Sequence, residues 1–208
     1  IADADFRKSL LNTVIYSLMF IPLDLILALM LAIAVQKIKG KSFYRLFYFM
    51  PVVTGSVSVG VIWTWIMNGD FGLLNTILGA VGITGPKWLT DPKIVLFSIV
   101  IVSVWWNVGY NMVLLLAGLQ NIPEVYYEAA EIDGANKWKA FRHITLPMLS
   151  PTLFFVLIMT IISSFQVFDQ AYVMTQGGPM KASYTLVYHI YQGAFVEFRM
   201  GGACAASV

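Results

Sequence analysis

The sequence predicts an all-α membrane protein built as a polytopic bundle of helices. Its composition is the first reason, because 59% of the 208 residues are hydrophobic and 12% are charged, whereas about 25% of the residues in a soluble domain are charged. The second reason is that the apolar residues gather in runs of about 20, the length that a helix needs to cross a bilayer. A net charge of +2, with basic residues scattered over several loops, gives no support to nucleic-acid binding.

Four apolar runs are the predicted membrane spans, and a fifth begins near Met200. The first run contains one charged residue, Asp24, and the next three contain none. The carboxylate is expected to face the bundle or a partner chain, and it has no second buried acid or base beside it to form a proton relay. The predicted spans cover residues 12–35, 48–67, 94–119, 148–168 and 200–208.

The loop between the first two spans predicts the orientation of the chain. It is densely basic and has no acidic residue, which is typical of cytoplasmic loops. Alternation then places residues 120–147 inside and the loops 68–93 and 169–199 outside. The basic residues of the first loop are Lys37, Lys39, Lys41 and Arg45.

Each outer loop is expected to contain a helix of its own. Turn residues surround a short apolar stretch at 73–81. Aromatic residues recur at helical spacing over 184–198, which favours a helix lying along the membrane surface.

A charged, glycine-broken segment lies between the third and fourth spans, and its residues predict two short helices joined by a reversal. Pro123 and Glu124 suit the first turn of a helix that continues to Ile132. Gly134 permits a left-handed cap, and Asn136 is a candidate N-cap for the second helix. The segment is too short and too charged to enter the bilayer, so we expect it to contact a soluble partner; the alternative is a simple linker.

This segment resembles the signature loop of the permease subunits of binding-protein-dependent ABC importers, whose motif is EAAxxDGAxxxxxFxxIxLP. The carbohydrate-uptake branch is indicated by FYFMPVV, NGDFGLLN, AGLQNIPEVYYEAA and TQGGP. The resemblance extends over essentially the whole sequence and implies the type I importer (MetI-like) permease fold, with the preceding N-terminal helix and most of the last helix absent from a single transmembrane domain. The motif positions are Glu128, Ala129, Ala130, Asp133, Gly134, Ala135, Phe141, Ile144, Leu146 and Pro147.

The resemblance implies a multi-pass transporter subunit of a prokaryotic cytoplasmic (inner) membrane. The loop 120–147 would couple it to cytoplasmic ABC ATPase subunits, which would hold the ATP and Mg²⁺, so that this chain is expected to bind no cofactor and to be no enzyme. No GxxxxGK[ST] run is present to bind phosphates. The other implied partners are an extracytoplasmic solute-binding protein and a second permease, which the resemblance favours as a different homologous chain.

Polar and aromatic side chains in the third and fourth spans are the candidates for a solute path. Sugar hydroxyls need hydrogen-bond donors and acceptors, and sugar rings stack on aromatic faces. The alternative is that these groups only join neighbouring helices. The candidates are Ser103, Trp106, Asn107, Tyr110, Asn111, Thr160, Ser163, Ser164 and Val167.

Other functions remain open. The same architecture could import glycerol phosphate or a polyol, although charge-free third and fourth spans disfavour a phosphate ester. An ion-coupled secondary carrier would need ionisable groups inside the membrane, and only Asp24 offers one. No catalytic triad can be assembled, and neither the single Cys204 nor the distant His143 and His189 show metal-ligand spacing.

Overall fold

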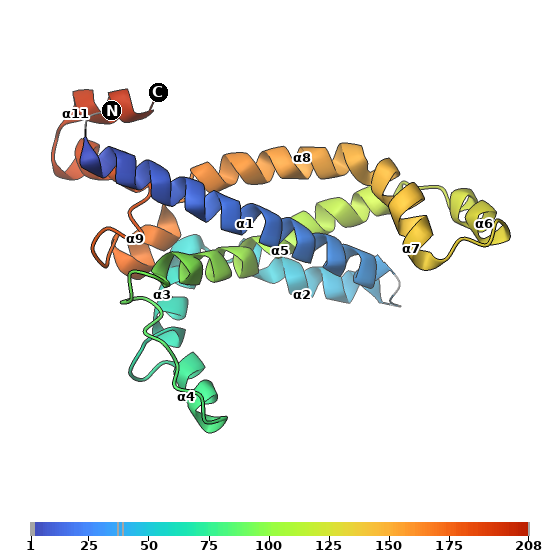
Figure 1. Ribbon diagram of the computed structural model, residues 1–208, viewed down its shortest axis with the longest axis horizontal. Helices are drawn as coiled ribbons and strands as arrows, with labels where there is room; N and C mark the ends of the chain where they lie inside the picture. The colour runs from blue at the N-terminus through green and yellow to red at the C-terminus, as the bar shows by residue number, and fades with distance from the viewer. Residues whose placement is uncertain (1–2, 37, 39, 208) are drawn as a thin grey trace. The chain divides into compact units, whose positions relative to one another are not determined.

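The computed structural model describes residues 3–36, 38 and 40–207, apart from the side chain of Lys41. Every regular element among these residues is a helix (Figure 1), which confirms the predicted all-α class. Lys37, Lys39 and the Lys41 side chain, on which the predicted orientation depends, lie outside the described residues.

The described chain forms two compact units, each assembled from segments that are distant in sequence. The first unit contains the chain up to Ile21, residues Thr54–Trp106 and the chain from Ile161 onwards. The second unit contains Pro22–Val53 and Asn107–Thr160.

Among the residues that the structure describes, three helices are long and apolar enough to cross a membrane: α1 (Ala4–Gln36), α5 (Val95–Gln120) and the continuous helix Lys137–Phe165. The last of these comprises α7 (Lys137–Ala140), a π-helical segment (Phe141–Thr145) and α8 (Leu146–Phe165). The apolar runs 12–35 and 94–119 form most of α1 and α5, and the run 148–168 extends three residues beyond the end of α8. Their assignment as membrane spans remains a prediction.

The run 48–67 does not form one continuous helix. It is divided between α2 (Lys41–Val53) and α3 (Ser56–Ile66), and the two helices meet at an angle of 92°. α2 continues past Pro51 to Val53, and the helix is interrupted at Gly55, which has an extended conformation with φ −57° and ψ 134°. The sequence therefore contains the break, although its hydrophobicity hides it.

The core of the second unit is formed by apolar side chains of α1, α5 and α8. Small residues allow close packing here, as at Ala28 and Ala32, which are fully buried. At Gly109 the approach is closest, because a Cβ atom there would lie 1.8 Å from the carbonyl oxygen of Tyr48. The larger members of this core include Met112, Leu115, Leu116, Leu119, Leu149 and Val156.

The first unit has a smaller core, in which α3 packs against α9 (Asp169–Thr175). Its buried members are Val59, Met67, Val102 and Met174. The two helices predicted for the outer loops are both present. They are α4 (Leu73–Ala80), and α10 (Leu186–Tyr191) with its π-helical continuation Gln192–Val196. The final helix, α11 (Met200–Ser207), begins at the residue where the fifth run was expected to start.

Candidate functional site

The signature segment begins with α6 (Val125–Ile132), which confirms the predicted helix. Its first turn is closed by the carbonyl oxygen of Glu124, which accepts hydrogen bonds from the backbone N–H groups of Tyr127 at 2.8 Å and Glu128 at 3.1 Å. Glu128 also supplies an acidic group to this first turn, which the positive end of the helix dipole stabilises.

The chain reverses at Gly134, which has the predicted left-handed conformation with φ +72°. Three backbone N–H groups close the end of α6: Asp133 donates to Ala129 O at 3.0 Å, Gly134 to Glu131 O at 3.0 Å and Ala135 to Ala130 O at 2.8 Å. The last carbonyl groups of the helix are therefore satisfied within the turn.

The second helix of the segment starts at Asn136, as predicted. Its side-chain oxygen accepts the backbone N–H of Lys139 at 2.9 Å, which is the geometry of an N-cap. The chain then runs from α7 through the π-helical segment directly into α8 (Figure 1). The two helices of the segment are joined again at its base, where the hydroxyl groups of Tyr127 and Thr145 lie 2.9 Å apart.

Much of this segment is exposed, including large apolar side chains. Ile132 is 87% exposed, Trp138 65% and Val125 60%. Among the motif residues, Ala130, Ala135, Phe141 and Ile144 are partly buried, whereas Glu128, Ala129, Asp133, Gly134, Leu146 and Pro147 are exposed. We name the segment Val125–Thr145 the knob: a locally bonded unit with an exposed apolar and charged surface.

The second unit brings four polar residues of α1, α5 and α8 together. The amide nitrogen of Asn111 donates to Asp24 Oδ2 at 2.5 Å and to Thr160 Oγ1 at 3.0 Å. The amide nitrogen of Asn107 lies 3.3 Å from the same carboxylate oxygen. Three of the four are buried and Asn107 is partly exposed, while Tyr110, one turn further along α5, is 39% exposed.

The first unit contains the other candidate path residues, and they differ in exposure. The Trp106 indole N–H donates to the carbonyl oxygen of Thr54 at 3.2 Å and so satisfies backbone at the break between α2 and α3. Ser103 is buried, and its hydroxyl has no hydrogen-bond partner. Trp106 thus bonds to the backbone of its own unit, and Ser103 lies in the interior of that unit.

The candidate path residues of the fourth run also differ in exposure and in hydrogen bonding. Ser163 is exposed, whereas Ser164 is buried and donates to Ile161 O at 2.7 Å within its own helix. Val167 is buried, and its carbonyl oxygen accepts the Thr185 hydroxyl at 2.9 Å. The predicted polar face of the fourth run therefore includes residues that bond within the protein.

Asp169 forms a polar contact that the sequence did not indicate. Predicted to lie in an outer loop, it begins α9 and accepts a hydrogen bond from the hydroxyl of Ser56, the first residue of α3. The bond joins the starts of two helices that follow breaks in the chain. Gly55, a residue type that often interrupts helices, would have indicated the start of α3 at Ser56, which is one end of this contact.

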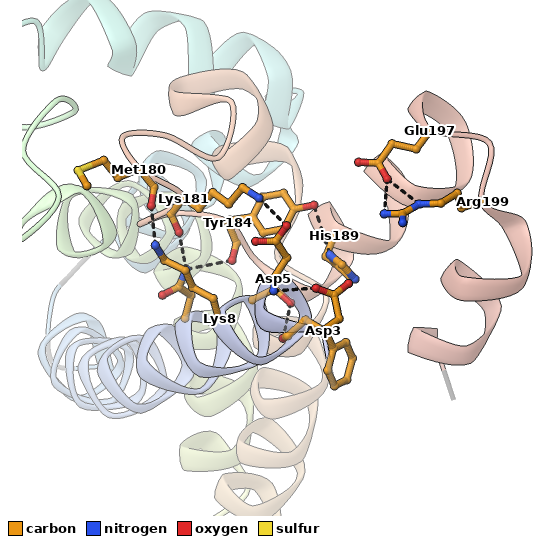
Figure 2. A network of polar contacts seen from close by, with 12 residues as sticks. Asp3, Asp5, Lys8, Met180, Lys181, Tyr184, His189, Glu197 and Arg199 are labelled. Atoms are coloured by element: carbon orange, nitrogen blue, oxygen red, sulfur yellow. Dashed lines mark hydrogen bonds and ion pairs between the residues drawn. The ribbon is translucent and has the colours of Figure 1, made fainter. Parts of the chain in front are cut away.

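A second polar network ties the start of α1 to the segment between α9 and α10 (Figure 2). Lys181 forms an ion pair of 2.5 Å with Asp5, and Lys8 Nζ donates to the carbonyl oxygen of Met180 at 2.6 Å. The Asn12 amide donates to the carbonyl oxygens of Lys181 at 2.9 Å and Tyr184 at 3.0 Å. These contacts hold a turn in which Met180 and Lys181 have positive φ angles.

Beside this network lies a cavity of about 440 Å³, lined in part by Tyr184, Tyr188 and His189. The Tyr184 hydroxyl is 3.3 Å from His189 Nδ1. Burial, reinforced by the charge of Asp5, raises the pKa of Tyr184 to about 12, so this hydroxyl keeps its proton to higher pH than an ordinary tyrosine does. In the described part of the chain, no three His, Cys, Asp or Glu residues are grouped to hold a metal ion.

Comparison with known proteins gives consistent matches. A family model described as "Binding-protein-dependent transport system inner membrane component" matches residues 6–208. The probable ABC transporter permease protein YesP of Bacillus subtilis is 39% identical, with 98% of this chain and 67% of YesP covered. The sn-glycerol-3-phosphate transport system permease protein UgpA of Agrobacterium fabrum is 37% identical, with 100% of this chain and 71% of UgpA covered.

The lactose transport system permease protein LacF of Rhizobium radiobacter is also 37% identical, with 99% of this chain and 70% of LacF covered. Among solved structures, a chain of a bacterial ABC transporter that imports the acidic polysaccharide alginate has a TM-score of 0.88 at 21% identity, with 99% of this chain and 73% of that chain covered. That likeness supports the fold.

Proposed function

Because this chain belongs to the family of inner membrane components of binding-protein-dependent transport systems, and is thus a multi-pass permease subunit and not an enzyme, we propose that it forms the translocation path for a sugar or oligosaccharide. We further propose that the knob couples this path to a cytoplasmic ABC ATPase. In this proposal ATP and Mg²⁺ are bound by the ATPase, a solute-binding protein delivers the solute, and a second, different permease completes the path.

The single observation that carries the coupling role is the construction of the knob. Its reversal, its N-cap and its Tyr127–Thr145 contact are all made within the segment, so it can keep its shape when the surroundings move. Its surface exposes Ile132 and Trp138, and exposed large apolar groups beside charges are typical of a protein interface. A continuous helix connects it to α8, which gives a direct route for transmitting movement.

The sugar assignment depends on α5. Asn107 and Tyr110 combine amide and aromatic groups on partly exposed positions one turn apart, and sugars are bound by such groups. LacF is described by its name as a lactose transporter, which agrees with this interpretation.

Import of another solute, such as a glycerol phosphate or a polyol, is the second candidate, and UgpA's name supports it. A phosphate ester would need basic groups near the path, yet α5 contains no lysine or arginine. An ion-coupled carrier is disfavoured, because Asp24 is the sole acidic or basic side chain in the predicted first span and the second to fourth have no Asp, Glu, Lys or Arg.

The complete importer, reconstituted with its binding protein in proteoliposomes, tests the proposal. ATP hydrolysis and uptake are measured with lactose, other oligosaccharides, glycerol and sn-glycerol 3-phosphate. Stimulation by a sugar and dependence of its uptake on ATP are expected. Stimulation by the phosphate ester alone would contradict the sugar assignment, and uptake that persists without ATP would contradict the coupling role.

A further inference from the structure

Asp24 is a fully buried carboxylate in the middle of α1, with 0% of its surface exposed. Its Oδ2 atom accepts hydrogen bonds from the side-chain amide nitrogens of Asn111 at 2.5 Å and Asn107 at 3.3 Å. Its Oδ1 atom is buried without a hydrogen-bond partner. One half of the carboxylate is therefore satisfied by α5, and the other half is not.

No cation neutralises this carboxylate within the described part of the chain. The ion pairs found there join Lys181 to Asp5 and Arg199 to Glu197, and neither involves Asp24. A carboxylate in an apolar helix is costly when it lacks a counter-ion. An amide could accept the same hydrogen bonds at lower cost, so packing alone gives no reason for a carboxylate at this position.

The charge of the carboxylate changes the electrostatic potential on the accessible side of α5, because one of the residues that it contacts is partly exposed. Asn107, bonded to Asp24, is partly exposed, and Tyr110 is 39% exposed three residues further along the same helix. Charges separated by a few ångströms of protein interact far more strongly than in water. A negative charge at Asp24 therefore makes the potential negative at Asn107 and Tyr110.

We propose that Asp24 is a specificity-determining residue that excludes anionic solutes from the path lined by Asn107 and Tyr110. The path accepts neutral or cationic sugars and disfavours phosphorylated sugars and uronates. Because an ionised carboxylate only accepts hydrogen bonds, Asp24 also positions the two asparagines with their NH₂ groups towards α1. This inference rests on the proposed function, since it assumes that this face of α5 lines the path.

The test measures the electrostatic potential at Tyr110 directly and does not depend on knowing the solute. Tyr110→Cys is made in a Cys204→Ser background, because Cys204 is the exposed native thiol. In membranes that contain the complete importer, this thiol is modified with a cationic trimethylammonium methanethiosulfonate and an anionic sulfonate methanethiosulfonate of similar size. Val81→Cys, just after α4 and 73% exposed, is the matched control site outside the knob.

At Tyr110→Cys the cationic reagent should react faster, by about tenfold relative to its advantage at Val81→Cys. Asp24→Asn, which keeps the size of the side chain, should remove most of this preference, and so should Asp24→Ser. Co-purification of the ATPase with each variant checks that the importer has assembled. If Asp24→Asn fails to assemble, Asp24→Ser provides the comparison. Failure of both variants to assemble would mean that the carboxylate is structural and would overturn the inference.

The possible results separate this inference from the proposed function. An unchanged reagent preference in Asp24→Asn would overturn the role of Asp24 and leave the path in place. A thiol at Tyr110 that reacts with neither reagent would show that this face does not line an aqueous path, and would overturn both.

Discussion

Replacing Gly134 with proline should abolish ATPase binding and ATP-driven uptake, because it removes the reversal that shapes the knob. Gly134 has φ +72°, whereas proline fixes φ near about −65°. Proline also lacks the N–H that Gly134 donates to Glu131 O at 3.0 Å, and it disfavours the ψ of 4° at the preceding Asp133. The incompatible backbone costs about 3 kcal/mol and the lost hydrogen bond about 1 kcal/mol, enough to open a turn held by three such bonds.

Gly82→Pro is a matched control in the loop after α4. Gly82 has φ +80° and donates its N–H to Gly79 O at 3.0 Å, and a Cβ atom added at either Gly82 or Gly134 would have no neighbouring atom within 4 Å. Both variants are assayed for membrane insertion, co-purification of the ATPase and ATP-driven uptake. Gly134→Pro should insert normally but lose ATPase binding and uptake, while Gly82→Pro keeps ATPase binding. Normal uptake by Gly134→Pro would refute the coupling role of the knob.

Three further predictions concern packing, the path and pH. Gly109→Ala should lower the melting temperature of the solubilised protein by several degrees, because its Cβ would lie 1.8 Å from backbone at Tyr48, whereas Gly79→Ala, with no atom within 4 Å, should not. Asn107→Leu, at a partly exposed position of α5, should weaken uptake without loss of ATPase binding; lost binding would indicate a packing role. Since the pKa of Tyr184 is raised from 10.0 to about 12, the unfolded chain releases this proton first, so stability should fall as pH rises from 10 to 12, and Tyr184→Phe should reduce that fall in alkaline melting experiments.

The knob could be predicted closely from the sequence, because its structure is determined locally. The helix ending at Ile132, the left-handed Gly134 and the Asn136 cap each depend on groups within a few residues of one another. Such short-range preferences depend on the residue types at the caps and can be recognised in the sequence. The apolar runs likewise indicated where the long helices lie, although one run is broken between Val53 and Ser56.

The polar contacts of the helices could not be predicted in the same way. Asp24 meets Asn111 across 87 positions of sequence and Asn111 meets Thr160 across 49, and helical spacing says nothing about which helices are neighbours or how they are rotated. The same limit applies to Asp169, whose partner Ser56 is 113 positions away. Periodicity placed Ser164 among the path candidates, but its hydroxyl bonds to its own helix, a choice that serine commonly makes.

This difference also explains why the family is easier to identify than the solute. A surface proposed to dock on an ATPase has to keep one shape, and a short segment with internal bonds keeps it through strict residue choices such as Gly134 and Asn136. Solute selection depends instead on the potential and the hydrogen-bonding groups that separate helices present together, so a single residue on α1 can change it without altering any motif. Asp24 is proposed to be such a residue: it lies outside the signature segment, yet it is bonded to the partly exposed Asn107 and to the buried Asn111 of α5.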